Sequence, residues 1–189
     1  MTQQAKLWTP PLWLGFLWGF AEGTFFFIIP DLLLSWACLS SARKGLQMLG
    51  VIVAASLIAG VLMYAWASSH PGSSRALVAS VPFVTPRMFE QVQTDYGNHG
   101  AFGMLKGPGS GIPYKVYAVL APPVLPLGTF LTMSIPARIQ RLALSWLLFT
   151  IIGRVFAGWL TKHPRVTALL FAALWTMVYA GYWIRICGT

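Results

Sequence analysis

Long apolar runs separated by short polar segments dominate the chain, and they predict its helices. The cleanest run covers residues 46–66, and a helix needs about 20 mostly apolar residues to cross a bilayer. Two further runs, 138–160 and 166–187, are of similar length. We therefore expect an all-α integral membrane protein, with residues 1–189 forming a single membrane domain.

The first apolar run, 12–39, is interrupted. Glycines recur in it, Glu22 lies inside it, and Pro30 and Asp31 break it. A proline inside a helix removes a backbone hydrogen bond and clashes with the preceding turn. Broken backbone at membrane depth is tolerated only inside the protein or along a wet cavity. The pattern predicts a re-entrant or broken helical hairpin over 12–30, followed by a helix that begins at Asp31.

A second interrupted run covers residues 100–125. Its centre, 106–115, is so rich in glycine and proline that a continuous helix is not expected there. We expect a second re-entrant hairpin over this run. Between the two runs, residues 68–85 are expected to form a polar, proline-containing connection. Residues 86–96 carry apolar side chains at helical spacing, which predicts an amphipathic helix on the membrane surface.

The composition agrees with a membrane protein. Hydrophobic residues make up 57% of the chain and charged residues 9%, whereas a soluble domain usually carries about 25% charged residues. The formal net charge is +9, but the basic residues are dispersed. We therefore expect basic cytoplasmic loops and contacts with lipid headgroups, and no nucleic-acid partner. The two cysteines show no metal-ligand spacing, and no cofactor is expected.

The two interrupted runs correspond to each other. Paired segments that are interrupted by glycine and proline in two halves of a chain point to an inverted repeat with a central binding site. The acids of this site would come from one half and the bases from the other. Each run has a charge, an apolar stretch, a proline and a second charge: Glu22, Pro30 and Asp31 in the first, and Lys106, Pro113 and Lys115 in the second.

Placing four charges in two membrane segments has a large energetic cost. A charged residue at the centre of a membrane helix costs about 2.5–3.5 kcal/mol on insertion scales. These residues therefore either form buried salt bridges or serve a function, and the two interpretations are compatible. Carboxylates in apolar surroundings take up protons more readily than in water. We expect Glu22 and Asp31 to exchange protons during a transport cycle.

Further cations extend the candidate site. Arg138 and Arg141 are three residues apart at the expected start of a helix, so they share a face. Anchoring on the cytoplasmic side explains this pair equally well, and snorkelling toward the membrane surface explains Arg154. Lys115 together with Arg138 and Arg141 would suit a phosphate group, because a guanidinium binds phosphate bidentately. Lys106 and Arg154 are the remaining candidates for substrate binding.

Three motifs carry a family resemblance. They are Phe20-Ala21-Glu22-Gly23-Thr24-Phe25-Phe26-Phe27-Ile28-Ile29-Pro30-Asp31, then Tyr96-Gly97 with Ile112-Pro113-Tyr114-Lys115-Val116, and then Phe130-Leu131 with Ser134, Arg138 and Arg141. In this order they resemble the DedA membrane-protein superfamily, also called the VTT or SNARE-associated domain. The resemblance is strongest to its short YqaA-like branch and covers roughly residues 13–160.

This resemblance implies two re-entrant hairpins that meet near the bilayer centre between transmembrane helices. It also implies translocation of a lipid with a phosphate headgroup, such as undecaprenyl phosphate or a phospholipid. The expected location is the bacterial cytoplasmic membrane, and the expected energy source is the proton gradient. In this family the acidic pair would be Glu22 and Asp31, and the headgroup-facing bases would be Lys115, Arg138 and Arg141.

Three other functions remain open. The first is a proton- or cation-coupled transporter of a small solute. The second is an intramembrane enzyme using Ser110, which lies between two glycines. Such chemistry needs a base within hydrogen-bond reach, the three histidines are all expected in loops or at helix ends, and we do not expect an enzyme. The third is a scaffold, in which the small residues of 54–60 would serve association, including homo-oligomers.

Overall fold

The computed structural model describes residues 7–187, which form helices joined by short turns and contain no β-strand. This confirms the all-α prediction. The helices are α1 (Leu12–Thr24), α2 (Asp31–Ser40), α3 (Ala42–Ser69), α4 (Pro71–Ser80), α5 (Pro86–His99), the 3₁₀ helix η1 (Gly100–Lys106), α6 (Gly107–Ser110), α7 (Tyr114–Leu120), α8 (Leu127–Val155), α9 (Ala157–Lys162) and α10 (Pro164–Cys187).

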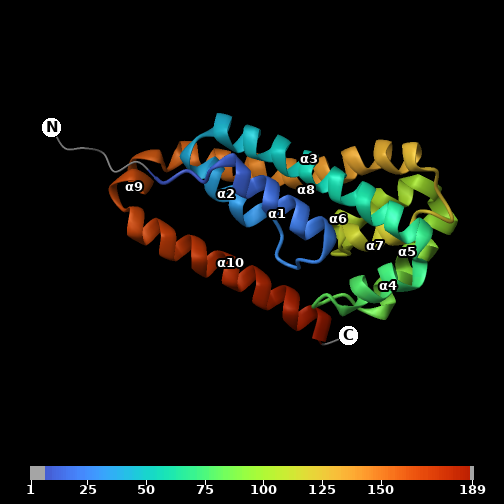
Figure 1. The fold of residues 1–189 in the computed structure, drawn as a ribbon. Coiled ribbons are helices and arrows are strands. Elements are labelled where there is room, and N and C mark those ends of the chain that lie inside the picture. Colours follow the sequence, from blue (N-terminus) through green and yellow to red (C-terminus); the bar gives the residue numbers. More distant parts are fainter. Residues whose placement is uncertain (1–6, 188–189) are drawn as a thin grey trace.

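Three of these helices, α3, α8 and α10, are long and apolar enough to cross a membrane. Figure 1 shows α1, α2, α3 and α8 lying along one another, with α10 running obliquely beside them. The short helices α4, α5 and α7 gather at the end of the molecule away from the N-terminus. The first interrupted run is thus two helices, α1 and α2, joined by the break 25–30.

Helix α8 differs from its prediction. It was expected to begin at Arg138, but it begins at Leu127 and carries Pro136 inside it. A proline in a membrane helix is tolerated because neighbouring groups satisfy the freed backbone atoms. Arg138 and Arg141 therefore lie in the middle of a long helix, not in its first turn.

A second difference involves a proline at the start of a helix. The segment 68–85 was expected to be a connection, but it contains α4, with Pro71 in the first turn. Proline suits this position, because the first backbone N–H groups of a helix have no intrahelical partner. Pro86 begins α5 in the same way. The basic residues Arg43 and Lys44 are exposed in the first turn of α3.

Helix α1 packs against α3 through a row of glycines. A Cβ atom at Gly19 would lie 2.9 Å from the backbone oxygen of Ile52, and one at Gly23 would lie 2.6 Å from the Cβ atom of Ala59. Small residues at every fourth position allow two membrane helices to approach backbone to backbone. This close approach places Glu22, which precedes Gly23, against the centre of the helix bundle.

We predict that Gly19→Ala destabilises the fold, because the added methyl group would meet the backbone of α3. Overpacking of this kind typically costs about 1–3 kcal/mol. The matched control is Gly50→Ala in α3, where an added Cβ meets nothing within 4 Å, so that only helix propensity changes. Thermal unfolding of the purified protein in detergent should show a lower midpoint for Gly19→Ala than for Gly50→Ala. Equal midpoints would contradict the close packing.

Candidate functional site

The two interrupted runs meet in the interior of the molecule. Pro30 caps the start of α2 and Pro113 caps the start of α7, so each predicted breaking proline stands just before a helix. Before Pro113 the chain turns at Gly111, whose φ of +79° lies in the left-handed region that favours glycine. The fully buried Lys115 of α7 then reaches the other break, where its Nζ donates to the carbonyl oxygen of Phe26 at 3.0 Å.

Helix α10 covers both breaks. The hydroxyl of Tyr179 accepts a hydrogen bond from the backbone N–H of Ile29 at 2.9 Å. One turn further along, the hydroxyl of Tyr182 donates to the carbonyl oxygen of Gly111 at 3.0 Å. Backbone groups that the breaks leave without helical partners are thus satisfied by side chains from a third element. The arrangement fixes the two breaks relative to each other.

A buried ion pair joins α1 to α8. The Nη2 atom of Arg138 lies 2.5 Å from Oε2 of Glu22, and both side chains are almost fully buried. The Nε atom of the same guanidinium donates to Ser56 Oγ of α3 at 3.1 Å. The Cζ atom of the guanidinium lies over the Tyr114 ring, 5.1 Å from the ring centroid, which is a cation–π contact. Three other helices, α1, α3 and α7, therefore hold this one arginine of α8.

The Tyr114 ring is itself positioned by small neighbours. Its hydroxyl donates to Ser134 Oγ at 2.8 Å, and Ser134 Oγ donates to the carbonyl oxygen of Phe130 at 2.7 Å. The ring lies directly against Gly60 of α3, where an added Cβ would come 2.9 Å from Cζ of the ring. Any larger residue at position 60 would displace the aromatic face on which Arg138 rests.

A second ion pair is looser. Arg141 Nη2 lies 2.8 Å from Asp31 Oδ2, but the two atoms are not aligned for a hydrogen bond. The carboxylate accepts its aligned hydrogen bond from Ser145 Oγ, at 2.6 Å. The Arg141 side chain is 30% exposed, whereas the carboxylate is buried. This arginine can therefore turn toward another anion at lower cost than Arg138 can.

The cluster carries more positive than negative charge. Three cations, Lys115, Arg138 and Arg141, meet two carboxylates, Glu22 and Asp31, which leaves one positive charge in excess. An uncompensated charge in a low-dielectric interior is costly unless an anion or water approaches it. A cavity of about 210 Å³ borders the cluster, and Lys115, Arg141 and Glu22 are among its lining residues. The excess charge and the cavity together form a site suited to an anion.

Two of the predicted substrate-binding residues lie outside this cluster. Lys106, in η1, is 51% exposed, and its Nζ donates to Oδ1 of the buried Asp95 at 3.4 Å. The same carboxylate accepts a hydrogen bond from the Tyr117 hydroxyl at 3.1 Å. Arg154 is exposed in the last turn of α8. Of the two lysines of the second run, only Lys115 lies in the site, and Lys106 does not.

Several residues of the site were not identified from the sequence. Ser145 lies four residues after Arg141, so helical spacing would have placed both on one face. Ser56 was hidden among the small residues of α3, which suggest packing more readily than hydrogen bonding. Tyr179 had no local signal, because its partner Ile29 is distant in the sequence.

Comparison of the chain with family models, with curated proteins and with solved structures found no match. The resemblance to the DedA superfamily therefore stays a prediction. What the described residues establish is a helical protein with three helices long and apolar enough to cross a membrane, which indicates a membrane protein. Within residues 7–187, no group of three or more histidines, cysteines and acids could hold a metal ion.

We predict that Arg138→Ala strongly destabilises the protein, because Glu22 would be left as a buried charge without its partner. Breaking a buried pair in this way typically costs about 3–5 kcal/mol. The double variant Glu22→Gln with Arg138→Gln should recover part of the loss, since no lone charge remains. Arg154→Ala is the control, because that side chain is exposed. Denaturant titration in micelles measures all of these, and a double variant no more stable than Arg138→Ala would contradict the ion pair.

Proposed function

We propose that this protein moves a lipid with a phosphate headgroup between the leaflets of the bacterial cytoplasmic membrane, as a multi-pass flippase or scramblase. The observation that supports this most directly is the buried excess of positive charge beside a cavity, at the meeting point of the two interrupted runs. Half-buried guanidinium groups are well suited to phosphate, because they donate two parallel hydrogen bonds to it. The resemblance of the motifs to the DedA superfamily agrees with this function.

In the proposed architecture the two interrupted runs are re-entrant hairpins related as an inverted repeat. Their breaks lie at membrane depth, which is tolerated because they face the bundle and are satisfied by Lys115, Tyr179 and Tyr182. Binding sites of many transporters lie at such a repeat interface. Movement of the hairpin pair would expose the site to one leaflet at a time.

The proposed binding step is an exchange of anions. The phosphate first meets Lys115 and Arg141, which line the cavity. Arg141 turns from Asp31 to the phosphate at low cost, because that pair is poorly aligned and partly exposed. A phosphate that penetrates further competes with Glu22 for Arg138. A carboxylate that loses its arginine then lies in an apolar environment, and it takes up a proton where the bound phosphate brings more negative charge than the cluster has in excess.

Charge balance makes this coupling depend on the headgroup. A phosphomonoester carries a charge of about −1.5 to −2 near neutral pH, whereas a phosphodiester carries a single negative charge. The cluster holds one positive charge in excess, so a diester neutralises it without a proton. A monoester leaves one negative charge too many, which one proton on Glu22 or Asp31 removes. Polyprenyl phosphates are monoesters, so their transport would be coupled to protons.

The decisive test is translocation in vesicles that contain the purified protein and a labelled polyprenyl phosphate. We predict that Arg141→Gln reduces the initial rate by at least about tenfold, as expected for the loss of a charge-assisted pair worth 1.4 kcal/mol or more. Arg154→Gln, on the same helix but exposed, should transport like the wild type. Movement of neither this lipid nor a phospholipid by correctly folded protein would exclude the proposed function. Transport of free inorganic phosphate alone would favour the solute transporter.

We also predict that an imposed pH gradient accelerates transport of the polyprenyl phosphate but leaves transport of a phosphodiester phospholipid unchanged. In Glu22→Gln, movement of the polyprenyl phosphate should fall to background, because Arg138 has no counter-ion to which it can return when the phosphate leaves. The measurement is lipid movement in the same vesicles with the gradient on and off. An equal response of both lipids to the gradient would contradict the charge-balance mechanism.

A further inference from the structure

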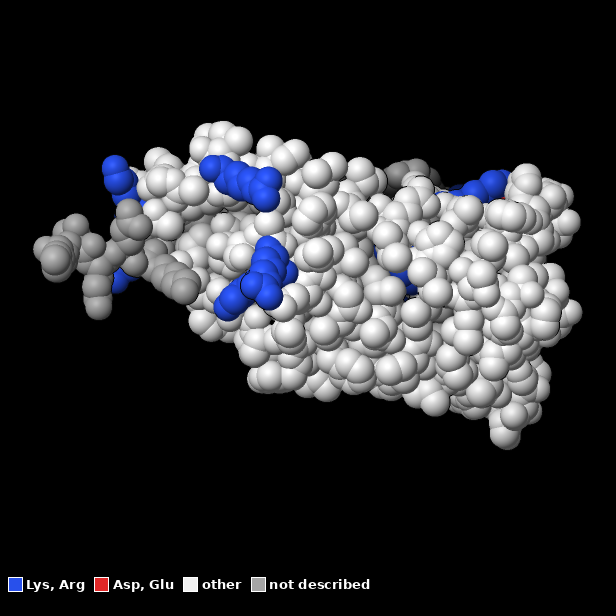
Figure 2. Space-filling view, turned by 90° about the horizontal axis from the view of Figure 1, so that it is seen from above, with Lys and Arg blue, Asp and Glu red and all other residues white. Residues whose placement is uncertain are grey.

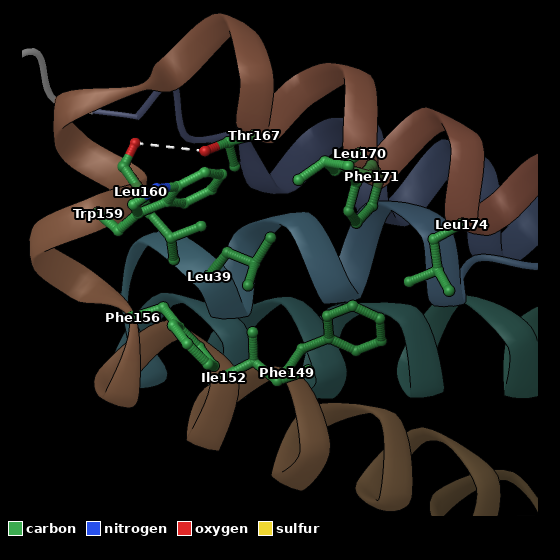
Figure 3. A pocket seen from close by; sticks show the side chains of 10 residues that line it. All are labelled: Leu39, Phe149, Ile152, Phe156, Trp159, Leu160, Thr167, Leu170, Phe171 and Leu174. Carbon is green, nitrogen blue, oxygen red and sulfur yellow. Dashed lines mark hydrogen bonds between the residues drawn. The ribbon is translucent and has the colours of Figure 1, made fainter.

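An apolar cavity of about 380 Å³ lies between α2, α8, α9 and α10. Figure 3 shows leucine, isoleucine and aromatic side chains from these four helices surrounding it. Two of the lining side chains carry a polar group: Thr167, whose hydroxyl donates to the backbone carbonyl oxygens of His163 and Leu160, and Trp159, through its indole N–H. All the other lining side chains are hydrocarbon, so the walls are almost wholly apolar. Water is not favoured in such a space, but a hydrocarbon is.

The cavity lies at a fixed distance from the charged cluster. In α2 and α8, a residue that lines the cavity follows a residue at the cluster by eight positions. In α10, which runs the other way, the cavity residue comes eight positions before the cluster residue. Eight residues of α-helix span about 12 Å, and one leaflet of the hydrocarbon core is about 15 Å thick. A lipid with its headgroup at the cluster would thus bring its chain to the cavity. The three pairs are Asp31 and Leu39 in α2, Arg141 and Phe149 in α8, and Tyr179 and Phe171 in α10.

The apolar cavity and the cavity beside the charged cluster both open along the same edge of α10. Leu170 and Leu174 line the apolar cavity, and Val178 lines the cavity at the charged cluster. These three residues recur at every fourth position and are all exposed, so they form one stripe along the openings of the two cavities. A lipid lying along this stripe would reach both spaces from the side. It would not pass through the buried layer between them, where the Trp175 indole N–H donates to Ser35 Oγ at 3.2 Å.

We propose that this apolar cavity binds the hydrocarbon chain of the same phosphate lipid whose headgroup is held by the charged cluster. The inference rests on the proposed function and makes it more specific: the cargo is bound at both ends, and a free phosphate is not an equivalent substrate. Entry into the cavity gains little hydrophobic energy, because the bilayer is as apolar as the protein. The gain comes from filling the void and from tethering by the headgroup, which raises the local concentration of that one chain.

Photolabelling tests this tethering. The probe is phosphatidic acid with a diazirine near the end of one acyl chain, and the comparison probe is the diacylglycerol with identical chains but without phosphate. Both are added to vesicles containing the full-length protein, and the labelled segments are mapped by mass spectrometry. We expect phosphatidic acid to label residues 149–160 and 167–174 several-fold more than diacylglycerol does.

Filling the cavity provides the matched variants. Ile152→Trp places a large ring into the cavity from α8, whereas Ile151→Trp adds the same ring to an exposed neighbour that does not line it. Leu170→Trp and its exposed neighbour Leu169→Trp repeat the comparison on α10, in case the first variant fails to fold. Labelling at the cavity by phosphatidic acid should fall several-fold in each lining variant and persist in each neighbour.

The outcomes separate this inference from the proposed function. Equal cavity labelling by both probes, or labelling that survives Ile152→Trp and Leu170→Trp, would overturn the inference, since the chain would then be bound without its headgroup or elsewhere. Labelling by phosphatidic acid that is lost in Arg141→Gln would support it by connecting the two spaces. Translocation that is insensitive to Arg141→Gln would instead remove the proposed function, whatever the labelling pattern.

Discussion

The Glu22–Arg138 ion pair is the contact on which the arrangement of the interior depends. A lone charge at this depth would be expelled or neutralised, so each partner requires the other to be in place. Glu22 reaches its position only because glycines let α1 approach α3 closely. Arg138 reaches its position because α8 continues through Pro136. Ser56 and Tyr114 then complete the shell of the guanidinium and bring α3 and α7 to the same point.

The three cations of the cluster differ in how firmly they are held. Arg138 has a carboxylate, a hydroxyl and an aromatic face as partners. Arg141 has a close but misaligned carboxylate, and Lys115 has a neutral carbonyl oxygen. For the proposed phosphate ligand, this gradation would set an order of contacts, from the least satisfied cation to the most satisfied one. A site of three equally paired cations would have no such order and would release its carboxylates only at high cost.

The sequence predicted those features that depend on local pattern. Apolar runs located α3 and α10, and glycines, prolines and intramembrane charges located both breaks and five of the cluster residues. Features that depend on tertiary context were missed. The run 138–160 did not show that α8 begins at Leu127 and continues through Pro136, because a proline inside a helix is unfavourable unless other groups compensate. Lys106 and Lys115 looked equivalent, and only the packing of η1 beside Asp95 distinguishes them.

The separation of the two ion-pair partners along the chain has a consequence for biogenesis. Glu22 and Arg138 are 116 positions apart, so the ribosome synthesises α2 to α7 before the carboxylate of α1 can meet its arginine. In the proposed membrane architecture, the first helix until then carries a charge that the lipid does not tolerate well. It must wait at the membrane surface, within the insertion machinery, or with its carboxyl group protonated. In the proposed architecture, membrane insertion of the first helix would therefore be completed only when the later helices supply its partner.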